Sequence, residues 1–182
     1  MADKNEAKSS TEPLKIYKTL KMDSQLIGPL LRGEKYVTRR KTAVTYHRSN
    51  AEPGIWHYWK LFSISDHIDT IEGETYRIPA GAELFVSSPE QKIIKNAPIQ
   101  AGDRVLFLEV LPDGVSRNVA TATASRVRIE HIQDITEAEA LFEGFGSRED
   151  FRLFMDSIYP GYWNHNGSVW VYELEDIQEV QR

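Results

Sequence analysis

The stretch Gly33-Glu34-Lys35-Tyr36-Val37-Thr38-Arg39-Arg40 combines a glycine, an amine, a hydroxyl group and two guanidinium groups. Glycine commonly ends a helix in the left-handed conformation, so we expect Lys35 to leave such a turn close to the start of a strand. An amine that is partly removed from water loses its proton more easily. Lys35 could then act as a base toward a nearby hydroxyl group, which makes this octet the first place to look for function.

The composition limits the classes of protein to which this chain can belong. Its 182 residues fit one domain, and a hydrophobic fraction of 41% supplies a core. The net charge of −5 argues against binding long double-stranded DNA, which requires a basic face. Cysteine is absent, which excludes disulfides and thiolate ligands. No apolar run reaches the length of a signal peptide or a membrane span, so we expect a soluble, cytoplasmic protein without a membrane partner.

Composition also changes along the chain. Residues 1–12 hold no aromatic or branched aliphatic side chain, and we expect a disordered tail there. We expect residues 13–182 to form a single domain. Within it, residues 41–98 form an inserted segment in which short aromatic runs are interrupted by proline and glycine, a pattern typical of short strands and loops.

Apolar patterning predicts strands in four places. Alternation over Leu14 to Met22 favours a half-buried strand. A buried strand over residues 105–110 is expected to pair with one over residues 119–129 across the turn Pro112-Asp113-Gly114. Residues 169–174 should form the closing strand.

Helix signals are local and specific. A short helix containing Pro29 should end at Gly33. Thr136 and Glu139 have capping-box spacing, and that helix should end at Gly144. Ser147 should begin another helix, whose apolar positions follow helical spacing: Phe151, Phe154, Met155 and Ile158. We therefore predict an α+β fold, a small and mostly antiparallel β-barrel with a few short helices at its mouth.

The octet resembles the Gly-x-Lys-x-x-x-x-Arg signature of ASCH domains, a PUA-like β-barrel family, with Gly33, Lys35 and Arg40 at the fixed positions. Three further matches occur in the family's order, namely Gly102-Asp103 before a strand, Ser157-Ile158-Tyr159-Pro160-Gly161 after a helix, and Trp170-Val171-Tyr172-Glu173 as the last strand. Together the matches cover most of residues 20–177 outside the inserted segment. The resemblance implies a PUA-like barrel.

The resemblance also implies a set of catalytic residues. Family members similar to N(4)-acetylcytidine amidohydrolase use a lysine, a threonine and a glutamate, and Lys35 and Thr38 match the Lys-x-x-Thr part of their pattern. Their glutamate lies seven residues after a helix-starting threonine, as Glu143 does after Thr136. The compact enzymes have a short loop in place of residues 41–98, so this segment bears on substrate choice.

These residue types permit amide hydrolysis without a metal ion or cofactor. Lys35 could deprotonate Thr38, whose alkoxide attacks an amide carbonyl, while Arg40 holds the oxyanion. Glu143 would protonate the leaving amine. Its position at a helix C-terminus and near Glu139 disfavours a second negative charge, which suits a proton donor.

Besides Arg40, three residues are candidates for substrate binding, namely Arg39, Tyr159 and Trp163. Arg39 and Arg40 are consecutive in a predicted strand and should point to opposite faces, and we expect Arg40 to be the one that points inward. Tyr159 and Trp163 flank a helix end and could stack on a base or fill the end of the barrel. The five histidines show no metal-ligand spacing, so no metal site is predicted.

Functions from different classes stay open at this point. One is an amidohydrolase acting on an acylated nucleoside or base. Another is a non-catalytic module that binds RNA or a nucleotide, and a metal-dependent ribonuclease is a third. The expected partner is a nucleoside or a short RNA. Lys35, Thr38 and Glu143 together favour the enzyme, whereas the extra surface of residues 41–98 favours the binding module.

Overall fold

The main sheet has five strands in the order β1-β8-β9-β10-β2. The computed structural model describes residues 17–61, 67–71, 74–78, 83–111 and 113–181. The predicted tail over residues 1–12 and the start of the first predicted strand lie outside these ranges. The strands of the main sheet are β1 (Lys18–Met22), β2 (Val37–Lys41), β8 (Arg104–Val110), β9 (Ser116–His131) and β10 (Ser168–Glu179).

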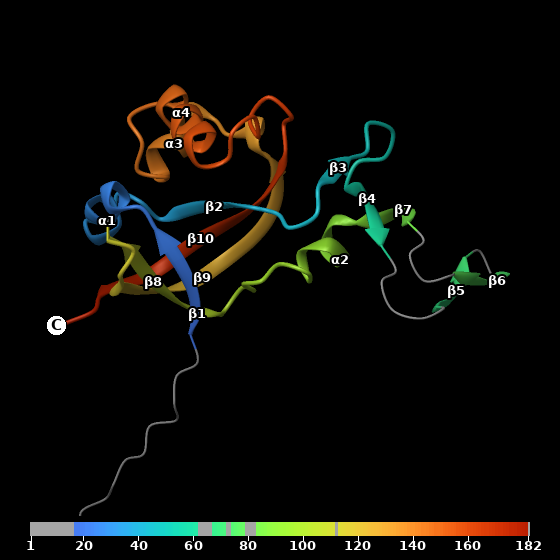
Figure 1. Cartoon of the computed structure of the whole chain (residues 1–182), viewed down its shortest axis with the longest axis horizontal. Coiled ribbons are helices and arrows are strands. Elements are labelled where there is room, and N and C mark those ends of the chain that lie inside the picture. Colours follow the sequence, from blue (N-terminus) through green and yellow to red (C-terminus); the bar gives the residue numbers. More distant parts are fainter. Residues whose placement is uncertain (1–16, 62–66, 72–73, 79–82, 112, 182) are drawn as a thin grey trace, which may run out of the picture.

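The main sheet curls into a half-barrel, as Figure 1 shows. β1 pairs with β8 in parallel, and the other three pairs are antiparallel. Among the described strands β1 and β2 are the two ends of the order, so the curl is open between them. The predicted strands are thus present, and the α+β, mostly antiparallel architecture is confirmed in this coarser form.

In the described ranges, four short α-helices and one 3₁₀ turn accompany the sheet. They are α1 (Ser24–Leu31), α2 (Glu90–Ile94), the turn Ile132–Asp134, α3 (Glu137–Phe142) and α4 (Arg148–Ile158). The predicted capping box of α3 is present: the Thr136 side chain accepts from the Glu139 amide, and the Glu139 carboxylate accepts from the Thr136 amide. Ser147 caps α4 by accepting from the Asp150 amide. Figure 1 shows α3 and α4 together over one side of the curl.

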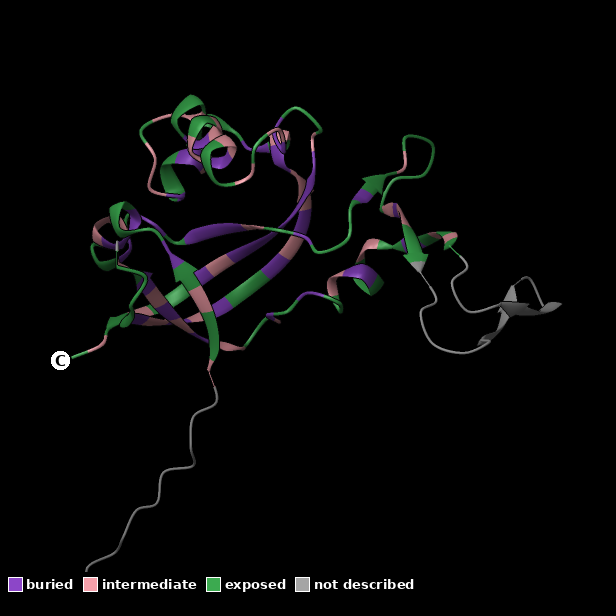
Figure 2. Cartoon of the chain, in the orientation of Figure 1, coloured by how far each residue is buried: buried purple, intermediate pink, exposed green. Residues whose placement is uncertain are grey.

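Both faces of β10 are covered over its first five residues, Ser168 to Tyr172, which are all buried. One core cluster includes Phe107, Ala122 and Tyr172. The other joins Val171 to α4 through Phe151 and other apolar side chains. Figure 2 shows buried residues on both the sheet and these helices. Helical spacing placed Ile158 on the apolar face of α4, but its side chain is 45% exposed.

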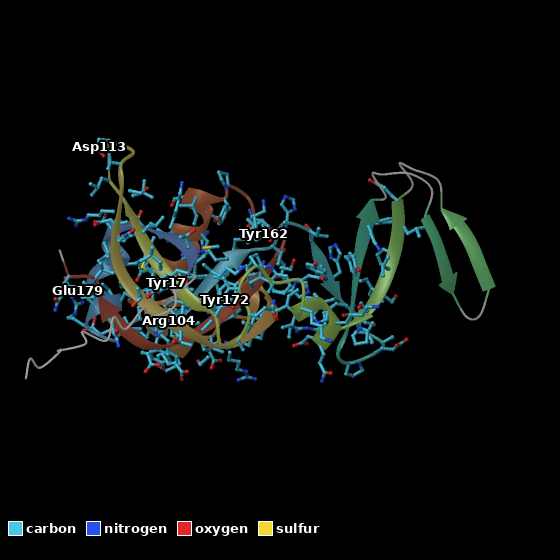
Figure 3. All side chains as sticks on the ribbon, turned by 90° about the horizontal axis from the view of Figure 1, so that it is seen from below. Tyr17, Arg104, Asp113, Tyr162, Tyr172 and Glu179 are labelled. Atoms are coloured by element: carbon cyan, nitrogen blue, oxygen red, sulfur yellow. The ribbon has the colours of Figure 1, made fainter. Side chains whose placement is uncertain are left out.

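Residues 41–98 carry two further small sheets. One has the order β3-β4-β7, and the other pairs β5 with β6. Their strands are β3 (Tyr46–Arg48), β4 (Ile55–Leu61), β5 (His67–Ile71), β6 (Glu74–Ile78) and β7 (Glu83–Pro89). Figures 1 and 3 both show the β3-β4-β7 sheet to one side of the main sheet. In Figure 3, Asp113 marks the tip of the β8–β9 turn at the opposite side.

Candidate functional site

The turn after α1 places Lys35 inside the protein. Gly33 has φ +73°, which confirms the predicted left-handed end of the helix. The backbone amides of Glu34 and Lys35 then donate to the Pro29 carbonyl at 2.9 and 3.1 Å. This tight turn aims the Lys35 side chain into the body, where it is 1% exposed.

A second left-handed glycine brings Glu143 to the same place. Glu143 is the C-cap of α3, and Gly144 follows with φ +87°. A methyl group on Gly144 would lie 3.1 Å from Cβ of Pro29 and 3.4 Å from Cβ of Lys35. Glycine at this position therefore permits the close approach of the α3–α4 turn to the turn after α1.

Lys35 and Glu143 form a buried ion pair. The Lys35 Nζ donates to Oε2 of Glu143, to the Glu143 carbonyl and to the Val37 carbonyl, each at 2.8 Å. All three N–H donors of an ammonium group are thus occupied. Burial lowers the pKa of Lys35, and the opposing attraction of Glu143 does not cancel this effect.

Arg39 is the second cation on the Glu143 carboxylate. It donates to Oε1 of Glu143 at 3.1 Å and also pairs with Glu130 at 2.9 Å and Glu139 at 3.2 Å. Burial, the largest single effect, lowers the pKa of Arg39, but the three carboxylates together outweigh it and the net direction is upward. The sequence-based argument that Glu143 suits a proton donor considered only its negative neighbours. It left out the positive charges of Lys35 and Arg39, which both contact the Glu143 carboxylate.

The two arginines are placed differently from the expectation. We expected Arg40, rather than Arg39, to point inward, but Arg39 is buried and Arg40 is half-buried. The reason is that α3 lies over the face of β2 that carries Arg39 and supplies carboxylates to it. Arg40 instead donates to the Lys21 carbonyl at 2.9 Å and to the Arg39 carbonyl at 3.0 Å. It therefore links β2 to β1 across the opening of the half-barrel.

Thr38 is fully buried but does not join the pair. Its Oγ1 has no hydrogen-bond partner within the described part of the chain. Thr38 lies opposite Tyr172 in the register of β10, and alternation along β2 directs it away from the face that carries Arg39. The structure thus brings Lys35 and Glu143 together and leaves the hydroxyl group out of contact with them.

A cavity of about 320 Å³ adjoins the ion pair. Its polar wall contains Lys35, Arg39, Arg40, Glu143 and Tyr159, and apolar side chains of α4 form the opposite wall. This volume is within the range of small-molecule sites, and a mostly apolar wall with a few converging polar groups is typical of them. The cavity could hold a planar base between α4 and the ion pair.

The structure places the two aromatic candidates, Tyr159 and Trp163, in different surroundings. Tyr159 lines the cavity, whereas Trp163 is buried in the core beside Phe151, with ring centroids 6.3 Å apart. The Arg148 guanidinium lies 4.8 Å from the Trp163 ring. Trp163 thus fills the space under α4, which is the alternative to base stacking that the sequence left open.

Sequence reasoning missed Lys21 and Lys41. Lys21 lines the cavity, and Lys41 lies 4.8 Å from the ring of Tyr162 and 5.7 Å from that of Tyr159. No motif marks either residue, because Lys21 occupies a polar position of an alternating strand and Lys41 follows the octet. Only the curl of the sheet brings them to the site.

The described residues contain no group of three or more His, Cys, Asp or Glu side chains that could hold a metal ion. Within the same ranges, no helix is long and apolar enough to cross a membrane. Comparison of the chain with protein-family models, with curated proteins and with solved structures finds no match. The resemblance to ASCH domains stays a prediction.

Proposed function

We propose that this chain is a PUA-like protein of the ASCH type that hydrolyses the amide of an acylated nucleoside or base without a metal ion. The observation that carries the proposal is the buried Lys35–Glu143 pair in the wall of a cavity of about 320 Å³. The curled sheet and the left-handed turn at Gly33 support the fold assignment. The Tyr159-Pro160-Gly161 stretch, which follows α4 directly, gives further support.

The ion pair supplies both an acid and a base. Transfer of one proton across the 2.8 Å contact from Lys35 to Glu143 gives a neutral amine and a carboxylic acid. The lowered pKa of Lys35 favours this transfer. The amine then takes a proton from the nucleophile, whose oxygen attacks the amide carbonyl, and Arg39 or Arg40 stabilises the oxyanion. Glu143 protonates the leaving amine as the C–N bond breaks, which restores the original charges.

The nucleophile is either Thr38 or a water molecule in the cavity. Thr38 matches the family pattern, but its hydroxyl group lies outside the contacts of Lys35. A water molecule attacks without any rearrangement of β2 and gives the acid and the amine directly. Thr38→Val removes the hydroxyl group at nearly constant volume and so separates the two routes.

The test is release of cytidine from N(4)-acetylcytidine, followed by chromatography. Glu143→Gln and Lys35→Met should each lower the rate at least about 100-fold, because a positioned acid or base contributes that much. Lys92→Gln in α2, which removes one exposed charge away from the cavity, is the matched control. Near-UV circular dichroism confirms that each variant is folded. Release at the wild-type rate by folded Glu143→Gln would overturn the proposal.

One observation favours a second function, which is binding of a base without catalysis. All three donors of Lys35 are occupied and Thr38 does not reach it, which is an arrangement that can hold a base without turnover. A binding module would show a thermal shift with cytidine or N(4)-acetylcytidine but no release, since a ligand that binds the folded state stabilises it.

A further inference from the structure

Two more hollows adjoin the cavity beside the ion pair. One, of about 430 Å³, shares Arg40 with the cavity, and another, of about 550 Å³, shares Tyr159 with it. These two hollows share Lys41 and Trp170 with each other. The three spaces therefore meet around β2, which ends the order of the described strands of the main sheet. We call the two outer hollows the β2-edge groove.

Cations without carboxylate partners gather at this groove. Lys18, Arg40 and Lys41 line the groove, and Lys21 lines the adjoining cavity. In the described ranges none of the four forms an ion pair, whereas Lys35 and Arg39 deeper in the cavity are both paired. The donors of Arg40 reach only backbone carbonyls, which are neutral.

The acidic groups nearby form no ion pair with these four cations. Asp23 lines the cavity, but its carboxylate accepts from the Gln25 amide as the cap of α1. The Glu143 carboxylate also attracts Arg40, but its hydrogen bonds go to Lys35 and Arg39. In a chain with a net charge of −5, a local excess of positive charge beside a cavity indicates an anionic ligand group.

We infer that the ligand of this site carries a phosphate, with its base in the cavity beside Lys35 and its phosphate in the β2-edge groove against Arg40, Lys41 and Lys18. The identity of the base rests on the proposed function. The phosphate follows from the groove itself, because an acylated base alone is neutral and leaves these cations without a role. Arg40 can form bidentate hydrogen bonds to phosphate oxygens, and the lysines add point charges. The phosphate belongs either to a free nucleotide or to a short single strand.

Calorimetric titration of the full chain with cytidine and with cytidine 5′-monophosphate tests the inference without any turnover. The monophosphate should bind about tenfold more tightly at low salt, since two or three partly exposed ion pairs give a difference of that order. Lys41→Gln and Lys18→Gln should each reduce this advantage while leaving cytidine binding unchanged, because both residues line the groove and not the cavity. Added salt should reduce the advantage too. Lys92→Gln makes the same charge change outside the groove and should retain the full advantage.

A cytidine trinucleotide distinguishes the two sources of phosphate. Tighter binding than the monophosphate assigns the site to a strand, and equal binding assigns it to a free nucleotide. Equal affinity for cytidine and its monophosphate, or an advantage that survives both lysine substitutions, would overturn the inference. Failure of amide hydrolysis with the phosphate preference intact removes only the proposed enzyme. Hydrolysis with no phosphate preference removes only the inferred phosphate site.

Discussion

At the scale of single residues, the site depends on how three buried charges compensate one another. Lys35 and Arg39 share the Glu143 carboxylate, and all three side chains are at most 3% exposed. Burying a charge without a partner costs several kcal/mol, whereas a well hydrogen-bonded group of opposite charges lowers that cost. Besides its proposed contact with substrate, Arg39 therefore compensates the buried Glu143 carboxylate as long as the proton remains on Lys35.

Tyr172 provides a prediction that is independent of the proposed chemistry. Burial raises the pKa of Tyr172 to about 12. In the unfolded chain this phenol ionises near pH 10, so between about pH 10 and 12 the folded chain holds the extra proton. Stability from this residue is complete below pH 10 and falls as the pH rises through 12, by about 3 kcal/mol in all.

Tyr172→Phe should therefore flatten the alkaline loss of stability. Urea unfolding between pH 8 and 11.5 measures this change, and the free energy of unfolding of the wild type minus that of the variant should fall as the pH rises. Burial also raises the pKa values of Tyr46 and Tyr162. These two residues remain in the variant, so part of the loss of stability at high pH should remain as well. Parallel curves over the whole range would show that Tyr172 does not titrate in this way.

At the scale of elements, the α3–α4 turn positions the site through Gly144. Gly144→Ala should lower the free energy of unfolding by about 2 kcal/mol or more, because a left-handed residue with a side chain costs about 1 to 2 kcal/mol and the new methyl group also meets Pro29 at 3.1 Å. Gly114→Ala is the matched control. Gly114 has φ +82° with no atom within 4 Å of an added methyl group, so only the backbone cost applies.

Urea unfolding of the two variants measures the difference. Gly144→Ala should also raise the KM for any ligand of the cavity, because the methyl group would lie 3.4 Å from Cβ of Lys35. Equal destabilisation of the two variants, with ligand binding unchanged, would show that the close approach at Gly144 has no consequence.

The elements that could be predicted from the sequence are those with local signals. The caps at Thr136 and Ser147 and the turn at Gly33 follow from hydrogen-bonding groups within three or four residues, and all three are present. The parallel pairing of β1 with β8 joins segments more than eighty positions apart, and no local pattern specifies it. The contact of Lys35 with Glu143 was expected from family spacing, not from physical reasoning.

Orientation around β2 was the least predictable feature of the site. Alternation correctly separates Arg39 from Arg40, but it cannot say which face α3 will cover. In the structure α3 packs on the Arg39 face through Ala140, in a cluster that also contains Phe151 of α4 and Val171 of β10. The same uncertainty affected Thr38, whose face is fixed by the register with β10.

At the scale of the whole molecule, the β3-β4-β7 sheet meets the main sheet through Trp56. This side chain is fully buried and lies with its ring centroid 5.1 Å from that of His131. The Arg48 guanidinium covers the Trp56 ring at 5.0 Å and pairs with Asp134 at 2.7 Å. Trp59 lies on the same strand but is 56% exposed, so the aromatic run around Trp56 does not form one core.

This contrast gives a prediction for tryptophan fluorescence. Of the four Trp residues, three are at most 8% exposed and only Trp59 faces the solvent. Iodide should therefore quench a fraction of the emission that disappears in Trp59→Phe and persists in Trp56→Phe. Quenching that is unchanged in Trp59→Phe would mean that the face of β4 carrying Trp59 is covered in solution.

The three hydrogen bonds of Lys35 fasten the start of β2 to the end of α3. Under the proposed hydrolysis the same amine would also move a proton, so each turnover would weaken this link between the two elements. A substitution that made the link more rigid would then slow the proposed reaction.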